Sequence, residues 1–144
     1  MKISSKGRYA LRFMCDLAIN GKNGLVSLKA VSERQNIGIK YLELIASMLL
    51  KAGFIESVRG PMGGYRLSMS PDEYTAAMIL ALTEGNMAPA PCLEKAKNTC
   101  EMKNKCATLK LWEKLNSAVY DVLNTTTLAD LTEEKISTPD YVLL

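Results

Sequence analysis

The stretch SLKAVSERQNIGIKYLELIASMLLKAGFIESVRGPMGGYRLSM, Ser27–Met69, contains the clearest structural pattern in the chain. A serine cap starts a predicted helix over residues 28–35, and the short turn Asn36–Gly38 leads into a second helix over about 39–52. That helix ends where Gly53 supplies the glycine expected just beyond a helix C-terminus. Two helices joined by so short a turn are typical of a helix-turn-helix.

Two segments that alternate in polarity, 54–59 and 64–69, follow as predicted strands. The turn Gly60–Gly64 between them is rich in glycine, which permits positive φ and a close approach to a ligand. A hairpin directly after a helix-turn-helix predicts a winged domain. Arg59 at the edge of the turn suits insertion into a narrow DNA groove, whereas a turn that joins two strands does not form a nucleotide-binding loop.

The helices of this domain show which sides should pack. In the helix over 39–52 the inward side consists of Leu42, Ile45, Ala46 and Leu49. Its outward side carries Lys40, Leu44, Ser47 and Lys51, flanked by Tyr41 and Glu43. A helix predicted over 5–20 has the inward stripe Ala10, Phe13, Met14, Leu17 and Ala18. A second stripe of Leu11, Cys15 and Ile19 predicts that this helix is covered on two sides, with Cys15 as a core residue.

The rest of the chain is also predicted to be helical, apart from one break. Ser70–Glu73 resembles a helix start and predicts a helix that runs to about Glu84. The break follows Glu84, where Pro89 and Pro91 exclude regular structure. Thr127 caps a short last helix. Between them a long helix over about 107–123 carries an apolar stripe of Leu111, Trp112, Leu115, Ala118, Val119, Val122 and Leu123. A helix with this much apolar surface needs a partner helix.

The predicted fold is therefore mainly α with a small β-hairpin. Residues 1–85 form a winged helix-turn-helix DNA-binding domain, and 86–107 form a cysteine-containing loop. Residues 108–131 form a long C-terminal dimerisation helix with a short helix after it, and 132–144 form a tail.

The charge distribution favours a polyanionic partner for the first half. Residues 1–66 carry eleven Lys or Arg and four Asp or Glu, a net charge of +7, whereas residues 67–144 carry seven and eleven, a net of −4. Neutralisation of phosphates dominates the affinity of proteins for nucleic acids. The asymmetry thus supports DNA as the partner.

Three cysteines are spaced Cys92-x7-Cys100-x5-Cys106 in a polar segment, and the chain contains no histidine. Thiolates are ligands that iron–sulfur clusters and zinc prefer. The spacing is unlike the paired C-x2-C of zinc ribbons, which disfavours a structural zinc site. Without histidine, a fourth ligand must be a carboxylate, another thiol or an exogenous group, with Glu94 and Glu101 the nearest acids.

Several classes of protein are disfavoured by the composition. There is no histidine to act as a base, no G-x-S-x-G motif and no dinucleotide fingerprint, so we do not expect an enzyme. No apolar run is long enough to cross a membrane, and the basic start lacks a signal-peptide pattern, so a cytoplasmic protein is expected. A small electron-transfer protein remains an alternative, which the helix-turn-helix and the wing disfavour.

Several stretches resemble a known family. Met1–Ala10 (MKISSKGRYA), Ser32–Glu43 (SERQNIGIKYLE) and Ser57–Tyr65 (SVRGPMGGY) are similar to the Rrf-type family of bacterial regulators, which includes IscR, NsrR and CymR. Leu111–Glu113 and Thr126–Leu131 share the resemblance. It implies a homodimeric winged-helix transcription factor whose protomers pair through the long helix and bind a pseudo-palindromic operator in double-stranded DNA.

Carried over residue by residue, the resemblance implies a set of DNA contacts. The recognition positions would be Lys40, Tyr41, Glu43 and Leu44, with Arg59 in the minor groove beside Gly60 and Gly63. Ser4, Ser5, Lys6 and Arg8 would lie near the phosphates. Leu44 is apolar where a hydrogen-bonding residue would read a base edge, which suggests contact with a thymine methyl group.

The resemblance further implies that Cys92, Cys100 and Cys106 hold a [2Fe–2S] or [4Fe–4S] cluster that switches operator affinity. IscR-like members use a histidine soon after the third cysteine, where this chain has Ala107 and Thr108, and other members recruit an acid where it has Arg8. The fourth ligand therefore stays open. CymR-like members lack the cysteines and respond through a partner enzyme, so a cluster-free regulator of cysteine or sulfur metabolism, controlled by a partner protein or thiol oxidation, is the alternative.

Overall fold

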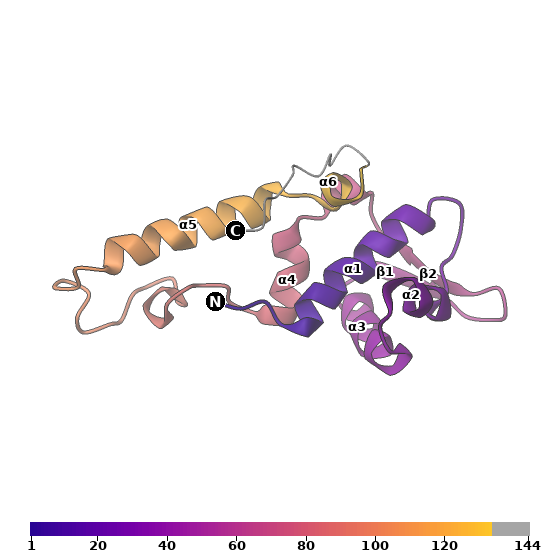
Figure 1. Cartoon of the computed structure of the whole chain (residues 1–144), viewed down its shortest axis with the longest axis horizontal. Coiled ribbons are helices and arrows are strands. Elements are labelled where there is room, and N and C mark those ends of the chain that lie inside the picture. Colours follow the sequence, from indigo (N-terminus) through magenta and orange to yellow (C-terminus); the bar gives the residue numbers. More distant parts are fainter. Residues whose placement is uncertain (134–144) are drawn as a thin grey trace.

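The computed structural model describes residues 1–133, and the tail expected from 132 onward lies outside the described residues from position 134. Figure 1 shows a winged domain at one end of an elongated molecule and α5 extending away from it, with α4 and α6 between. In chain order the elements are α1 (Ser5–Asn20), α2 (Leu28–Gln35), α3 (Ile39–Lys51), β1 (Ile55–Val58), β2 (Gly64–Leu67), the 3-10 helix η1 (Pro71–Glu73), α4 (Ala76–Glu84), the 3-10 helix η2 (Pro91–Leu93), α5 (Leu109–Thr125) and α6 (Leu128–Thr132). The mainly helical fold with one hairpin is confirmed.

Helix α1 is the centre of the core, because α2, α3, α4, α6 and β2 all pack around it. Its predicted inward stripe is buried, as is that of α3. The second stripe of α1 is covered only in part: Leu11 and Cys15 are half-buried against the core, whereas Ile19 is 53% exposed. Burial, with the nearby Asp16 carboxylate, raises the pKa of the Cys15 thiol to about 11. Cys15 is thus a protonated packing residue.

A buried carboxylate joins α1 to α2. Asp16 is 1% exposed and accepts hydrogen bonds from the Arg34 guanidinium at 2.6 and 3.0 Å and from the Gln35 side-chain amide at 2.9 Å. Burial acts to raise the pKa of this carboxyl, but the hydrogen bonds from Arg34 and Gln35 and the guanidinium charge outweigh it and hold the pKa below its usual value. This network fixes the first helix of the helix-turn-helix on the core.

Asp16→Asn should lower the free energy of unfolding by about 1–3 kcal/mol near neutral pH, because the charged hydrogen bonds from Arg34 are lost. The carboxyl is more acidic in the folded chain, so its contribution is present above the unfolded pKa of about 3.9 and is lost as the pH falls through the folded value. Urea unfolding should therefore show parent and variant converging in acid. Asn20→Ala, which removes a 3.3 Å hydrogen bond to the same carboxylate and a 3.2 Å hydrogen bond to the Asp16 carbonyl oxygen, leaves the Arg34 pair in place and should have a smaller effect. A difference independent of pH would contradict this account.

The wing is anchored at its base. Strands β1 and β2 pair in antiparallel register from Ile55 opposite Leu67 to Val58 opposite Gly64. Val26 extends the pairing through two backbone hydrogen bonds with Tyr65, at 2.8 and 2.9 Å. A Cβ on Gly64 would lie 2.6 Å from the Val26 carbonyl oxygen, so only glycine permits this close approach. The hairpin therefore projects from a fixed base.

The helix expected from Ser70 to Glu84 is wrong as a single element. Ser70 and Glu73 do form the capping box, but it closes only η1, and α4 starts again with Thr75 as its cap. Between them Tyr74 is extended and fully buried. Its hydroxyl donates to the Phe54 carbonyl oxygen at 2.7 Å and accepts from the backbone N–H groups of Ser68 and Met69 at 3.1 and 2.9 Å. Anchoring Tyr74 beneath the wing requires extended backbone there, which interrupts the helix.

Candidate nucleic-acid interface and cysteine segment

The outward side of α3 is open to solvent. Lys40, Glu43, Leu44 and Ser47 are exposed, and the 56% exposed Leu44 gives this surface an apolar centre. Tyr41 is half-buried instead, because its ring packs edge-on against Tyr9 of α1, with ring centres 5.6 Å apart. Three of the four implied recognition positions therefore lie on one exposed surface together with Ser47, and Tyr41 lies at its edge.

The start of α1 has a mixed character. The Ser4 hydroxyl caps α1 by accepting from the Gly7 N–H at 3.1 Å, and it donates to Glu84 at the end of α4. These hydrogen bonds from Ser4 hold the pKa of the Glu84 carboxyl below its usual range. Arg8 is exposed and donates to the Ser5 hydroxyl at 3.0 Å, while Lys6 is half-buried. Arg8 thus remains available for a phosphate, and Ser4 fastens α1 to α4.

The wing carries an unpaired positive charge near its tip. At its base Glu56 and Arg66, which face each other across the strands, form an ion pair of 2.8 Å. Arg59 is exposed beside the turn, and within residues 1–133 no carboxylate pairs with it. The turn itself is closed by a hydrogen bond from the Gly63 N–H to the Gly60 carbonyl oxygen at 2.9 Å. A free guanidinium therefore stands beside a fixed turn.

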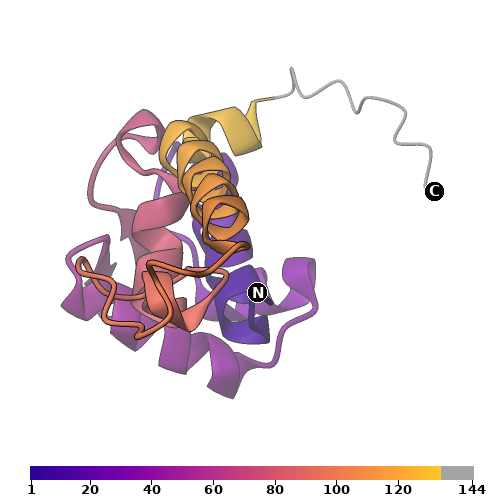
Figure 2. The ribbon, with the colours of Figure 1, turned by 90° about the vertical axis from the view of Figure 1, so that its left-hand side faces the viewer.

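The cysteine segment extends along α5 to the end farthest from the winged domain, as Figures 1 and 2 show. Cys92 is half-buried in η2, Cys100 and Cys106 are exposed, and all three are free thiols. In the part of the chain that the structure describes, no three cysteine or acidic side chains are gathered closely enough to hold a metal ion. Their chemistry suits a cluster, but their sulfurs are not brought together here.

Cys106 has the most distinctive surroundings of the three. Its sulfur lies 3.4 Å from the Thr108 hydroxyl, which also accepts from the Trp112 indole N–H at 3.2 Å. Hydrogen bonding by the Thr108 hydroxyl, and then by the backbone, lowers the pKa of the Cys106 thiol. Cys106 therefore forms the thiolate, which binds metals and reacts with oxidants, more readily than an ordinary cysteine.

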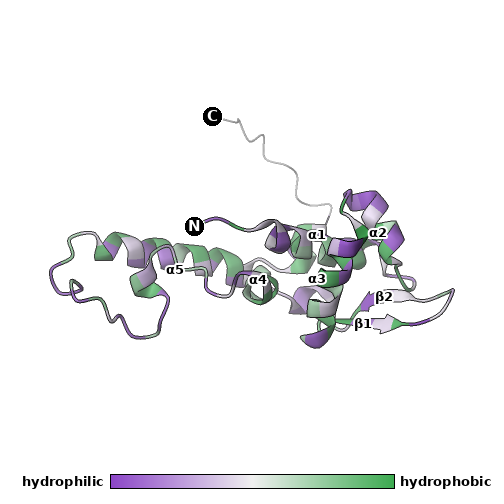
Figure 3. Cartoon of the chain, turned by 90° about the horizontal axis from the view of Figure 1, so that it is seen from below, coloured by the Kyte–Doolittle hydropathy of each residue, from purple (hydrophilic) through white to green (hydrophobic). Residues whose placement is uncertain are grey.

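Helix α5 buries none of its residues and has two apolar sides. One side is half-buried against the same protomer and consists of Trp112, Val119, Tyr120 and Leu123. The other side is exposed and consists of Leu111, Leu115, Ala118 and Val122, spaced by four, three and four residues. We call this second set the α5 seam; Leu111 and Val122 in it are 57% and 62% exposed. Figure 3 shows apolar residues along the length of the helix.

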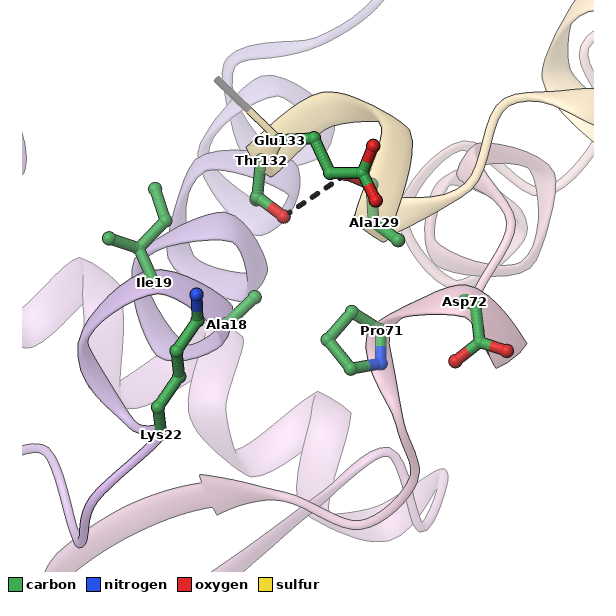
Figure 4. Close-up of a pocket in the computed structure, with 8 residues that line it drawn as sticks. All are labelled: Ala18, Ile19, Lys22, Pro71, Asp72, Ala129, Thr132 and Glu133. Atoms are coloured by element: carbon green, nitrogen blue, oxygen red, sulfur yellow. Dashed lines mark hydrogen bonds between the residues drawn. The ribbon is translucent and has the colours of Figure 1, made fainter. Parts of the chain in front are cut away.

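A groove of about 1060 Å³ lies between the end of α1, η1 and α6. Figure 4 shows Lys22 on one side and Asp72 and Glu133 on the other, with small or apolar residues between them. The groove is open to solvent, and its charged groups do not converge on one point (Figure 4). Its residues thus form no catalytic constellation.

The helix-turn-helix followed by a β-hairpin is the fold of winged-helix DNA-binding regulators, and the outward side of α3 is open to solvent in it. The family described as Rrf2, iron-dependent transcriptional regulator, matches residues 3–134, and the chain belongs to this family. It is therefore a transcriptional regulator and not an enzyme, as the sequence indicated. None of the described helices is long and apolar enough to cross a membrane.

Individual relatives lie in two groups of regulators. The HTH-type transcriptional regulator IscR of Aliivibrio salmonicida is 40% identical over 131 residues, covering 91% of this chain and 77% of that protein. The structure of CymR, the global cysteine regulator of B. subtilis, is 38% identical with a TM-score of 0.77 and covers 92% and 96% of the two chains. The oxidised form of Staphylococcus aureus CymR is 39% identical with a TM-score of 0.73, covering 92% and 97%.

Several residues that shape the site were not singled out from the sequence. Tyr74 and Asp16 position the wing and α2, and Thr108 links Cys106 to Trp112. Among them only Asp16, a polar residue within the apolar pattern of α1, gave a signal in the sequence. Tyr74 gave none, because its hydroxyl bonds to residues five to twenty positions away.

Proposed function

We propose that this chain is a homodimeric, DNA-binding transcriptional regulator whose operator affinity is switched at the cysteine segment through an iron–sulfur cluster held by Cys92, Cys100 and Cys106. The observation that supports DNA binding best is the pairing of an open α3 surface with the unpaired Arg59 on the wing. A regulator of this kind acts in the bacterial cytoplasm, where the DNA is.

Dimerisation rests on the α5 seam. Its spacing of four, three and four residues follows the repeat of two helices that pack side by side. A twofold dimer places two recognition helices on a pseudo-palindromic operator with half-sites about one helical turn apart, or a multiple of it.

A cluster at the three cysteines would supply a redox-sensitive and oxidant-sensitive group. The segment can close around a cluster at little cost in free energy, because residues 94–105 are largely exposed and contain no long helix or strand. The chain's own contribution is the connection to α5. The Met87 N–H donates to the Tyr120 hydroxyl at 3.2 Å at one end of the segment, and Thr108 joins Cys106 to Trp112 at the other. A rearrangement of the segment is thereby transmitted to the helix that pairs the protomers.

The test is anaerobic reconstitution with iron and sulfide. The parent should become brown, with absorbance near roughly 400 nm typical of the chromophore, and replacing Cys92, Cys100 and Cys106 by alanine should abolish the colour. Cys15→Ala is the matched control, because Cys15 packs against the core and is a protonated thiol, and it should keep the full absorbance. Colourless parent protein would refute the cluster.

The second candidate is a cluster-free regulator of cysteine or sulfur metabolism. The separated thiols and the lowered pKa of Cys106 favour this reading, as do the CymR structures among the relatives. Control would then come from a partner protein or from oxidation of Cys106, whose thiolate is the reactive form. In that case the parent would stay colourless after reconstitution, and mild oxidation alone would change its DNA affinity.

A further inference from the structure

The tip of the wing presents a large apolar side chain to solvent. Met62 is 89% exposed, more than any other large hydrophobic residue among residues 1–133. It occupies the third position of the turn Gly60–Gly63, directly after Pro61. A methionine so placed contributes nothing to the core, so its position calls for a partner outside the chain.

The turn holds Met62 in a fixed place. Gly60 has φ of 116°, and a Cβ on Gly63 would lie 2.1 Å from the Val58 carbonyl oxygen, so both positions require glycine. Pro61 fixes its own φ and thereby the path of the backbone before Met62. Figure 1 shows the turn extending beyond the helices of the winged domain. Only the flexible side chain of Met62 remains free to adapt.

The charges around the tip select the kind of partner. Residues 57–66 contain no acidic residue, and Arg59 stands three positions before Met62 without a carboxylate partner among the described residues. A cation beside an exposed apolar side chain fits the minor groove of DNA. Its phosphates attract the guanidinium, and where a base step opens, the apolar faces of its bases become accessible to a wedge from this groove.

We propose that Met62 acts as an apolar wedge that presses between two base pairs in the minor groove entered by Arg59, and so reads the deformability of that step. Pyrimidine–purine steps such as TA and CA unstack most easily, so the wedge favours them at a position where no hydrogen bond reads the base. The inference rests on the proposed DNA binding and adds a specificity-determining residue to it.

The test compares parent, Met62→Gly and Met62→Leu in parallel selections from a pool of random duplex DNA. The parent should enrich a pyrimidine–purine step at the flank contacted by the wing. Met62→Gly should lose that preference and keep the half-site read by α3, and Met62→Leu should retain both. On the parent's enriched duplex, Met62→Gly should bind about fivefold more weakly, the loss expected for one disfavoured base step.

A second readout reports the unstacking directly. With 2-aminopurine placed at the enriched step, its fluorescence should rise on binding of the parent and of Met62→Leu but not of Met62→Gly. Enrichment of the same flanks by all three proteins, without a change in fluorescence, would overturn the wedge while leaving DNA binding intact. A parent that enriches no sequence at all would overturn the proposed function, and the wedge with it.

Discussion

Leu115→Glu should convert the dimer into monomers and weaken operator binding by at least about 100-fold. The substitution places a charge at the centre of the α5 seam, where it would have to be buried without a partner when two helices pack. A monomer engages one half-site only and loses the gain from binding both together, commonly a factor of about 100 to 10,000. Analytical ultracentrifugation and a binding titration on the selected operator measure the two effects.

Ser117→Glu provides the matched control for this prediction. Ser117 is exposed on the same helix, outside the α5 seam, and the change in charge is identical. It should leave both the dimer and the affinity unchanged. If Leu115→Glu still sediments as a dimer, while Trp112→Glu gives monomers, the protomers pair through the other apolar side of α5.

Arg59→Ala should weaken operator binding by about 1–3 kcal/mol, with the largest loss on operators that have A·T-rich flanks. A narrow minor groove concentrates negative potential, which an arginine without an internal ion pair can use fully. Fluorescence anisotropy at constant salt measures the change. Arg66→Ala is the control, because Arg66 already pairs with Glu56 at the base of the wing, and its loss should matter much less.

A substitution of Glu43 provides a comparison for the Arg59→Ala measurement. An acid on the outward side of α3 repels phosphates and accepts hydrogen bonds in the major groove only from the amino groups of cytosine and adenine. Glu43→Ala should therefore relax specificity without reducing affinity, the opposite of Arg59→Ala. Equal affinities of parent and Arg59→Ala at matched salt would remove the wing from the DNA interface.

Local patterns made most of the winged domain predictable. The serine cap before α2, the short turn before α3 and the alternation in the hairpin each depend on neighbouring residues, and the structure confirms the elements they indicated. The interrupted helix after Ser70 could not be foreseen in this way. Its capping box is present, but the hydroxyl of Tyr74 bonds to the backbone of Phe54, twenty residues earlier, and this long-range contact prevails over the local signal.

The candidate site was likewise only partly predictable from local sequence patterns. The width of the apolar stripe on α5 indicated a need for partners, but only the packing of α4 separates Trp112 and Val119, which cover the same protomer, from the exposed seam. Cysteine spacing indicated ligand chemistry without saying whether the sulfurs converge. That depends on the path of a polar segment with few hydrogen bonds, which sequence patterns do not specify.

The most direct test of the switch is a comparison of operator affinity between reconstituted parent, cluster-free parent and the variant with alanine at Cys92, Cys100 and Cys106, all measured anaerobically at one salt concentration. The account predicts that the cluster-loaded parent differs from the cluster-free parent by at least about fivefold, the lower end of typical coupling between sites. The variant should match the cluster-free parent whether or not it is treated with iron and sulfide. Equal affinities for all three proteins would contradict the account.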